Sequence, residues 1–318
     1  MKNIVLLIIT IWFSTQLIAQ YAPAVGLLGS TAISKDSTII HNWATSCSIE
    51  RGWINIADTS MGKATSGDYD KALGKADNAT ISLGDGGIAT LSFVYPIYNG
   101  PSWDFVVFEN SFDDFFLELA FVEVSSDGQN FFRFPAHSLT QNDSQITTFG
   151  ILNTSKINNL AGKYRGGYGT PFDLSELPSY SQLNVQHITH IRIIDVVGSV
   201  DTTYGTVDTA LNMINDPFPT PFPVSGFDLD AVGVIHQVVG INAQNNRTTI
   251  LEIFPNPTTA FVNIKTSEGG ELALFSQLGK LVYKSSIIKG NNKIDLSSLS
   301  KGIYFGIINT TKFKIVVL

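Results

Sequence analysis

The sequence of 318 residues has a single cysteine, Cys47, so no disulfide can form within the chain. Charged residues are also scarce, at 15% of the chain, and acidic residues outnumber basic ones to give a formal net charge of −7. A chain without a basic field attracts polyanions poorly, so we expect no nucleic acid partner. Because 44% of the residues are hydrophobic, the chain can bury a sizeable core, and its stability must come from packing or bound ions.

Long apolar runs are missing except at the N-terminus, in MKNIVLLIITIWFSTQLIAQ. One early lysine, an apolar stretch and the small residue Ala19 are typical of a secretory signal peptide, which we predict over residues 1–19. No later segment approaches the roughly 20 apolar residues that a spanning helix needs. We therefore expect no transmembrane segment after cleavage.

Motifs of nucleophilic and zinc-dependent hydrolysis are missing as well. The sequence contains no G-x-S-x-G and no H-E-x-x-H, and its five histidines are scattered. Nothing around Cys47 would activate its thiol. These absences favour binding over catalysis.

Segments with the 3.6-residue period of an amphipathic helix are almost absent. Short runs rich in β-branched and aromatic residues, separated by Gly, Asn, Asp and Pro, predict an all-β fold. We expect strands over residues 89–95, 104–110, 118–126, 130–136, 187–198 and 227–235. Asp127 and Gly128 in SSDGQN predict a hairpin turn between two of these strands. So many amphipathic strands predict a large β-sandwich of jelly-roll type.

The composition changes after Gln237. The polar stretch over residues 239–250 predicts a linker between a β-sandwich binding domain, residues 20–238, and a smaller domain, residues 251–318. The smaller domain alternates polar and apolar residues and turns at LGK, KGNN and SKG. It is long enough for a compact, immunoglobulin-like sandwich of seven strands.

Four ordered segments of this tail, IFPNPTTAFVNI, LFSQLGKLVY, IDLSSLSKGIYFGII and KFKIVVL, carry a resemblance. They resemble the C-terminal sorting domain of type IX (Por) secretion substrates in Bacteroidota. The resemblance implies that the type IX machinery is a partner and that the tail is removed. It also implies a protein that is secreted or attached to the outer-membrane surface.

The N-terminal part carries a second resemblance, in SLGDGGIATLSF, DFVVFENSF, LAFVEVSSDGQNFFRF and GFDLDAVGVI. These segments resemble uncharacterised bacterial surface proteins with a galactose-binding-like jelly roll. The resemblance implies a fold more than a function, because that fold hosts binders of sugars, peptides and lipids. Jelly rolls of this kind commonly carry a structural calcium.

Oxygen-bearing side chains stand at the ends of three expected strands, and they are Glu109, Asn110, Asp195, Asp228 and Asp230. Asp228 and Asp230 share one face of their strand, where like charges repel. Ca²⁺ takes six to eight oxygen ligands and would relieve that repulsion. We therefore expect these five residues to bind a structural calcium. The alternative is that one aspartate caps a loop and the other is solvated.

Aromatic residues gather in segments that we expect to be loops. Tyr164, Arg165 and Tyr168 in AGKYRGGYGTPF are the first candidates for ligand binding, followed by Trp103 and Phe222. Exposed aromatic rings form stacking platforms for sugars, and arginine supplies directional hydrogen bonds. The alternative is that these rings seal the ends of the sandwich.

The sequence as a whole predicts an exported protein that binds a ligand without transforming it, and surface polysaccharide is the leading ligand. A second hypothesis is an accessory protein for outer-membrane uptake of a small nutrient such as cobalamin. A third is a glycoside hydrolase that uses two carboxylates. Glu118 and Glu123 are poor partners for such a pair, because they fall on opposite faces of their strand.

Overall fold

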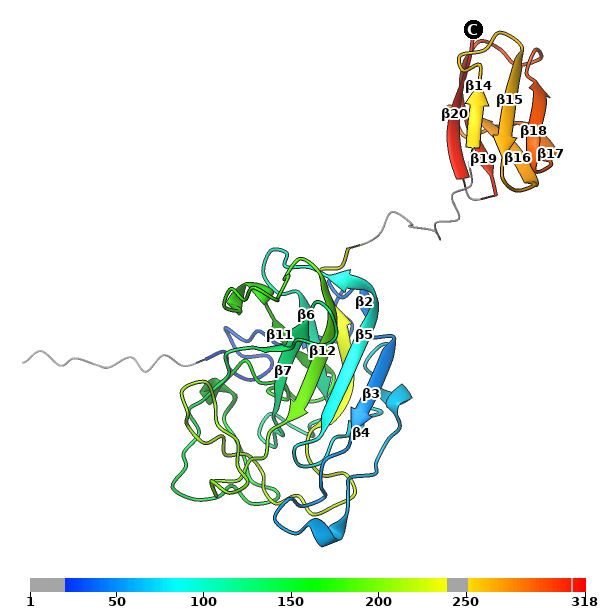
Figure 1. Cartoon of the computed structure of the whole chain (residues 1–318). Helices are drawn as coiled ribbons and strands as arrows, with labels where there is room; N and C mark the ends of the chain where they lie inside the picture. The colour runs from blue at the N-terminus through cyan, green and yellow to red at the C-terminus, as the bar shows by residue number, and fades with distance from the viewer. Residues whose placement is uncertain (1–20, 239–250, 310) are drawn as a thin grey trace, which may run out of the picture. The chain divides into compact units, whose positions relative to one another are not determined.

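The computed structural model describes residues 21–238, 251–309 and 311–318. The chain forms two compact units, Met1–Val239 and Gly240–Leu318 (Figure 1). The predicted signal peptide and the predicted linker lie outside the described residues.

The first unit contains two large antiparallel sheets. One has the strand order β1 (Ile33–Ser34), β11 (Tyr168–Phe172), β6 (Phe105–Glu109), β13 (Asp228–Val234) and β2 (Asn42–Trp43), with β4 (Ile81–Ser82) also on β13. The other has the order β3 (Ser46–Glu50), β5 (Ile88–Ile97), β12 (Ile188–Asp195), β7 (Ala120–Ser125) and β8 (Phe132–Arg133) (Figure 1). A small third sheet pairs β9 (His137–Ser138) with β10 (Ile157–Asn158).

The helical content of the described residues is limited to four single turns of 3₁₀ helix. These are η1 (Thr59–Met61), η2 (Tyr69–Ala72), η3 (Thr154–Lys156) and η4 (Leu174–Glu176). The predicted all-β fold is therefore confirmed.

The two large sheets share the main core. Over residues 88–92 of β5 and 191–195 of β12 the buried residues alternate with partly exposed ones, as a strand with one solvent face requires. Leu91 and Ile191 from these strands meet Phe105 and Leu229 from the opposite sheet. The sandwich thus forms as the alternating pattern predicts.

The strands β6 and β13 are buried on both faces. Their second face, which includes Val106 and Phe108, is covered by a smaller cluster against which Trp43 and Trp103 pack. Strands with two covered faces appear as continuous apolar runs in a sequence. Asp228 and Asp230 are therefore exceptional within β13, because they stand in a strand that has no open face.

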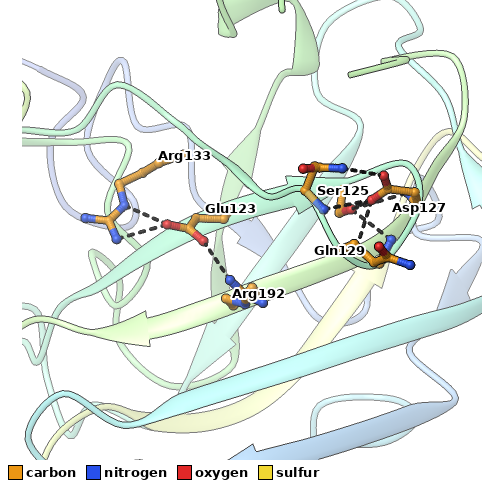
Figure 2. A network of polar contacts seen from close by, with 8 residues as sticks. Glu123, Ser125, Asp127, Gln129, Arg133 and Arg192 are labelled. Carbon is orange, nitrogen blue, oxygen red and sulfur yellow. Dashed lines mark hydrogen bonds and ion pairs between the residues drawn. The ribbon is translucent and has the colours of Figure 1, made fainter. Parts of the chain in front are cut away.

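The predicted hairpin at SSDGQN connects β7 to β8. Gly128 has φ +74°, a conformation that glycine adopts without strain. The Asp127 Oδ1 atom accepts hydrogen bonds from the backbone N–H groups of Gln129 and Asn130, both at 2.8 Å (Figure 2). The sequence prediction of this turn is confirmed.

The register of β7 places Glu123 beside two arginines. Glu123 faces Arg133 on β8 and Arg192 on β12. The Arg133 side chain donates to Glu123 Oε1 from Nε at 3.0 Å and Nη2 at 2.9 Å, and Arg192 Nη1 lies 3.5 Å from Oε2 (Figure 2). The protein therefore neutralises this largely buried carboxylate with its own side chains.

The second unit is built from two antiparallel sheets. One contains β14 (Leu251–Phe254), β15 (Phe261–Thr266) and β18 (Gly290–Asp295), and the other has the order β17 (Leu281–Ile287), β16 (Gly270–Ser276), β19 (Gly302–Ile308) and β20 (Thr311–Val317). Val262, Ile264, Leu272 and Ile315 are among its core residues. These seven strands in the described residues confirm the predicted small sandwich.

Candidate functional site

Four strands of the first unit carry acidic residues at one end. β6 ends at Glu109, β12 ends at Asp195, β13 begins at Asp228, and Glu118 stands just before β7. Register brings these ends together, because Asp195 pairs with Ala120 in one sheet and Glu109 with the neighbour of Asp228 in the other. The sandwich therefore gathers its strand-end acids in one region.

Asp195 links the two sheets at this end. Its Oδ1 atom accepts a hydrogen bond from the Phe227 backbone N–H at 2.7 Å, and its Oδ2 atom accepts one from Gly86 at 2.9 Å. Phe227 directly precedes β13, and Gly86 lies in the turn before β5. The carboxylate thus fixes two turns that the strand pairing alone leaves free.

Asp195 also lines a small cavity together with Asp85, Glu118 and Asp216, which we call the acid cavity. The cavity volume is about 10 Å³, which is room for one water molecule or one ion. All four acids are buried. Among the described residues that line this cavity there is no lysine, arginine or histidine.

The carboxyl groups of the acid cavity differ in their hydrogen bonds. Asp216 Oδ2 accepts from the Leu119 backbone N–H at 3.0 Å, and Asp85 Oδ2 accepts from Ile56 at 2.8 Å. Glu118 is 8% exposed as a whole residue. Its carboxylate lines the cavity and has no hydrogen bond to any described residue. Glu118 thus differs from Asp85, Asp195 and Asp216, each of which accepts a hydrogen bond from a backbone N–H group.

Burial raises the pKa of Glu118, Asp195 and Asp216 well above their ordinary values, because an ionised carboxylate loses its hydration there. Neighbouring acids raise these pKa values further. Asp85 acts on Asp195 and Asp216, while Asp228 and Glu109 act on Glu118. The region thus holds more acidic groups than its own basic groups neutralise.

The structure places four of the five residues predicted to bind calcium outside the acid cavity, where each has its own partner. Asp228 accepts a hydrogen bond from the Ser82 hydroxyl, and burial raises the pKa of Asp228 to about 6. Glu109 accepts from the Ser111 backbone N–H at 2.9 Å, and Asn110 Nδ2 lies 3.3 Å from the Thr80 hydroxyl. Asp195 alone of the predicted set lines the cavity.

Asp230 has other partners than Asp228 and lies at an irregularity in β13. Leu229 pairs with Glu109 and Ala231 with Phe108, so two positions of β13 oppose one of β6. A bulge of this kind redirects side chains. The Asp230 Oδ1 atom consequently accepts hydrogen bonds from Asp77 at 3.0 Å and Asn78 at 3.2 Å. Within the described part of the chain, no three His, Cys, Asp or Glu residues already form a metal-binding group.

A second feature lies on the surface, where four phenylalanines from three loops form a continuous series. Phe112 contacts Phe116 with ring centroids 5.8 Å apart, Phe116 contacts Phe149 at 6.2 Å, and Phe149 contacts Phe222 at 6.1 Å. Phe112 is 87% exposed, Phe149 73% and Phe222 41%. We call these four residues the phenylalanine row.

A larger cavity of about 660 Å³ adjoins the loops that carry the row. Phe115, Ile146 and Ile151 contribute apolar walls, and Gln141, Asn153 and Lys156 contribute polar ones. Two buried polar atoms of its lining, Asp114 Oδ1 and Thr140 Oγ1, have no hydrogen-bond partner among the described residues. We call this space the loop cavity.

The residues predicted to bind ligand are divided among different environments. Tyr164 is 1% exposed and its hydroxyl lies 2.8 Å from the Thr31 hydroxyl, so its ring is not available at the surface. Trp103 is partly buried against the second face of β6. Arg165 pairs with Asp114 of the loop cavity and lies 5.3 Å from the Tyr168 ring.

Phe222 alone of the predicted aromatic residues belongs to the phenylalanine row. Its other members were missed, although ENSFDDFF places phenylalanines beside acidic residues and TTFGI places one directly after two threonines. A large apolar residue in a polar loop is the signal that would have found Phe112 and Phe149.

Comparisons with known proteins identify the second unit. Residues 252–317 match the family described as the secretion system C-terminal sorting domain. The second unit is a type IX sorting domain. The protein is therefore a substrate of the type IX machinery and is secreted or attached to the cell surface, as the tail motifs predict. No helix of the described residues is long and apolar enough to cross a membrane.

The other similarities are partial. The chain is 32% identical over 81 residues to beta-agarase A of Zobellia galactanivorans, a match covering 24% of this chain and 15% of the agarase. The beta-glucuronidase of Ruminococcus gnavus in complex with uronic isofagomine aligns with 95% of this chain and 46% of its own, at 8% identity and a TM-score of 0.23. A biofilm associated protein BSP domain aligns with 73% and 49%, at 11% identity and a TM-score of 0.19. Scores this low support no argument.

Proposed function

We propose that the first unit binds carbohydrate on the surface formed by the phenylalanine row and the loop cavity, without transforming it. The observation that carries the proposal is the row itself. Soluble proteins bury large aromatic rings when they can, and a contiguous exposed series usually belongs to an interaction site. Rings about 6 Å apart offer successive flat apolar faces to the apolar faces of sugar rings.

The loop cavity adds the polar contacts that such a ligand needs. Asp114 Oδ1 can accept a hydrogen bond from a sugar hydroxyl, and Thr140 Oγ1 can donate or accept one. A few placed polar groups within mostly apolar walls are typical of ligand sites. The partial match to beta-agarase A agrees with this ligand class, since that protein is named as an agarase.

A small nutrient molecule is the second candidate ligand. The volume of about 660 Å³ falls within the roughly 300–1,000 Å³ usual for small-molecule pockets. The uptake hypothesis with cobalamin as cargo rests on this cavity rather than on the phenylalanine row. Binding that survives loss of the row would favour it.

The glycoside hydrolase hypothesis gains no support from the buried acids. A sugar-cleaving carboxylate pair needs a cleft that admits a sugar ring. The acid cavity has room for a single water-sized occupant. Its carboxylates therefore cannot reach a glycosidic bond in this conformation.

The test is binding of the full chain to a panel of insoluble and soluble polysaccharides, including agarose, with and without Phe149→Ala. We expect retention of the wild type on at least one polysaccharide and a loss of about tenfold in affinity for the variant. Because Phe149 is highly exposed, its removal should change the free energy of unfolding by less than about 0.5 kcal/mol.

Tyr69→Ala is the matched control, since Tyr69 is an exposed aromatic residue of the same unit that takes no part in the row. Its affinity should equal that of the wild type. Failure of every polysaccharide to retain the chain, or equal binding by Phe149→Ala, would overturn the proposal.

A further inference from the structure

The acid cavity combines features that the proposed binding surface does not use. Its four acids come from separate segments: the turn before β5, the residues before β7, the end of β12, and the loop between β12 and β13. Removing an ionised carboxylate from water is costly unless a partner of opposite charge replaces the lost hydration. Here four such groups line one space, and the described lining has no basic residue.

Two glycines make room for these carboxylates. A Cβ atom at Gly198 would lie 1.5 Å from Asp216 Oδ1, and one at Gly226 would lie 2.7 Å from Asp195 Oδ1. Gly226 also has φ +68°, where other residues are strained. Any larger residue at these two positions would collide with the carboxylates, so the close approach of backbone and acids depends on glycine.

Glu118 supplies the independent observation that indicates a ligand. The residue is 8% exposed and lines the cavity, and its carboxylate has no hydrogen bond to any described residue, whereas Asp195 and Asp216 are fixed by backbone N–H groups. A carboxylate without a hydrogen-bond partner in the protein is available to a positive ligand.

The chemistry of the donors selects the ion. All four side chains offer oxygen, which suits hard cations and not the softer metals that prefer histidine or cysteine. Mg²⁺ usually keeps several of its waters, and a cavity of about 10 Å³ has no space for them. Ca²⁺ accepts several carboxylates directly.

We propose that Asp85, Glu118, Asp195 and Asp216 bind one Ca²⁺ ion in the acid cavity. The site shares only Asp195 with the set predicted from the sequence. Because no three acids of the described residues already form a metal-binding group, the carboxylates of the cavity must move closer together when the ion binds. Asp216 and Phe222 lie in one loop, so the ion also stabilises the segment that carries one end of the phenylalanine row.

Protons compete with the ion for these carboxylates. The charged groups around Glu118 are Asp216, Asp195, Glu109 and Asp228, all of them acids. Arg51 is a basic group that acts on one of these acids, since it lowers the pKa of Asp228 against the larger effect of burial. Calcium affinity should therefore rise with pH as the acids lose their protons.

The test is calorimetric titration of CaCl₂ into the full chain after removal of metals with a chelator, at pH 7.5 and at pH 5. We expect one site per chain and weaker binding at pH 5. The melting temperature, followed by tryptophan fluorescence, should rise by roughly 5 °C or more at about one hundred times the Kd. All four tryptophans precede residue 104, so fluorescence does not report on the sorting domain.

Glu118→Gln should weaken calcium binding at least tenfold and, in chelator, melt no lower than the wild type, because it removes an unpaired buried charge. Glu123→Gln, whose carboxylate already has two arginine partners, should bind calcium as the wild type does. Asp85→Asn provides a second variant should Glu118→Gln not fold. The absence of binding heat and of any melting shift in the wild type would overturn the proposal, as would unchanged affinity in both cavity variants. These results do not depend on any polysaccharide.

Discussion

Glu118 and Glu123 are five residues apart, and the protein treats their carboxylates in opposite ways. Glu123 lies in β7 between Arg133 and Arg192, which hold both of its oxygens (Figure 2). Glu118 lies just before the same strand and lines the acid cavity together with three other acids. One buried acid is neutralised by basic side chains of the protein, while the other has no basic side chain in the cavity that it lines, and we propose that a cation neutralises it.

The difference between Glu118 and Glu123 indicates how buried acids are stabilised in a fold without disulfides. Arg133 and Arg192 lie on neighbouring strands, so strand register alone brings them to Glu123. The acids of the cavity lie at strand ends and in loops, where no register fixes the approach of a cross-strand partner. A bound ion can connect such segments, because it accepts ligands from several directions at once.

The largest effect is expected for Asp195→Ala, which should lower the free energy of unfolding by about 2–4 kcal/mol with or without calcium. The substitution leaves the buried N–H group of Phe227, and the N–H group of the exposed Gly86, without their acceptor. Urea unfolding followed by tryptophan fluorescence measures the effect. Asp195→Asn, which keeps one acceptor oxygen, should lose less. A change below about 0.5 kcal/mol for the alanine variant would show that Asp195 does not link the two sheets.

A smaller effect is expected from pH on the chain in chelator. Burial raises the pKa of Asp228 to about 6, above the ordinary value of 3.8 for an aspartate, so the folded state holds a proton that the unfolded state releases. Stability should therefore fall as pH rises from about 4 to about 6, by about 2 kcal/mol. Excess calcium should flatten this decline, since the ion replaces the protons at the neighbouring acids.

Urea unfolding at several pH values between 4 and 7 measures this dependence. Glu118→Gln should show a shallower decline than the wild type, because it cannot ionise. Stability in chelator that rises with pH over this range would contradict the account of the acid cavity.

The smallest effect on the free energy of unfolding is expected at Glu123, when its partner is changed by Arg133→Gln. The Arg133 side chain is 42% exposed and Arg192 remains beside Glu123, so the loss should be about 1 kcal/mol or less. High salt should reduce it further by screening. A double-mutant cycle with Glu123→Gln separates the ion pair from the contact of Arg133 with the Phe121 ring. A coupling of zero would show that Glu123 does not need this partner.

Much of the fold follows from local sequence rules. The alternation in β5 and β12, the turn at Asp127 and Gly128, and the tail motifs each depend on a few adjacent residues. The gathering of acids at strand ends was also visible, because Asp195 and Glu109 close strongly apolar runs.

The members of the acid cavity were harder to predict. Asp85 and Asp216 lie in turns and loops whose position depends on long-range packing. β13 has an irregularity at Asp230, whose partners differ from those of Asp228, and a rule of strict alternation cannot foresee it. The prediction that Tyr164 binds ligand failed for a similar reason. Its ring lies in a glycine-rich segment of the sequence, but long-range packing buries it. Partners distant in sequence decide each of these positions.

The most direct measurement of the central claim is a crystal structure of the full chain grown with CaCl₂ near pH 7.5, with anomalous data collected to locate calcium. The account predicts one anomalous peak in the acid cavity, with oxygens of Glu118, Asp195 and Asp216 at about 2.3–2.6 Å. A water molecule or a closed cavity at that position, with the acids hydrogen-bonded to each other, would contradict it.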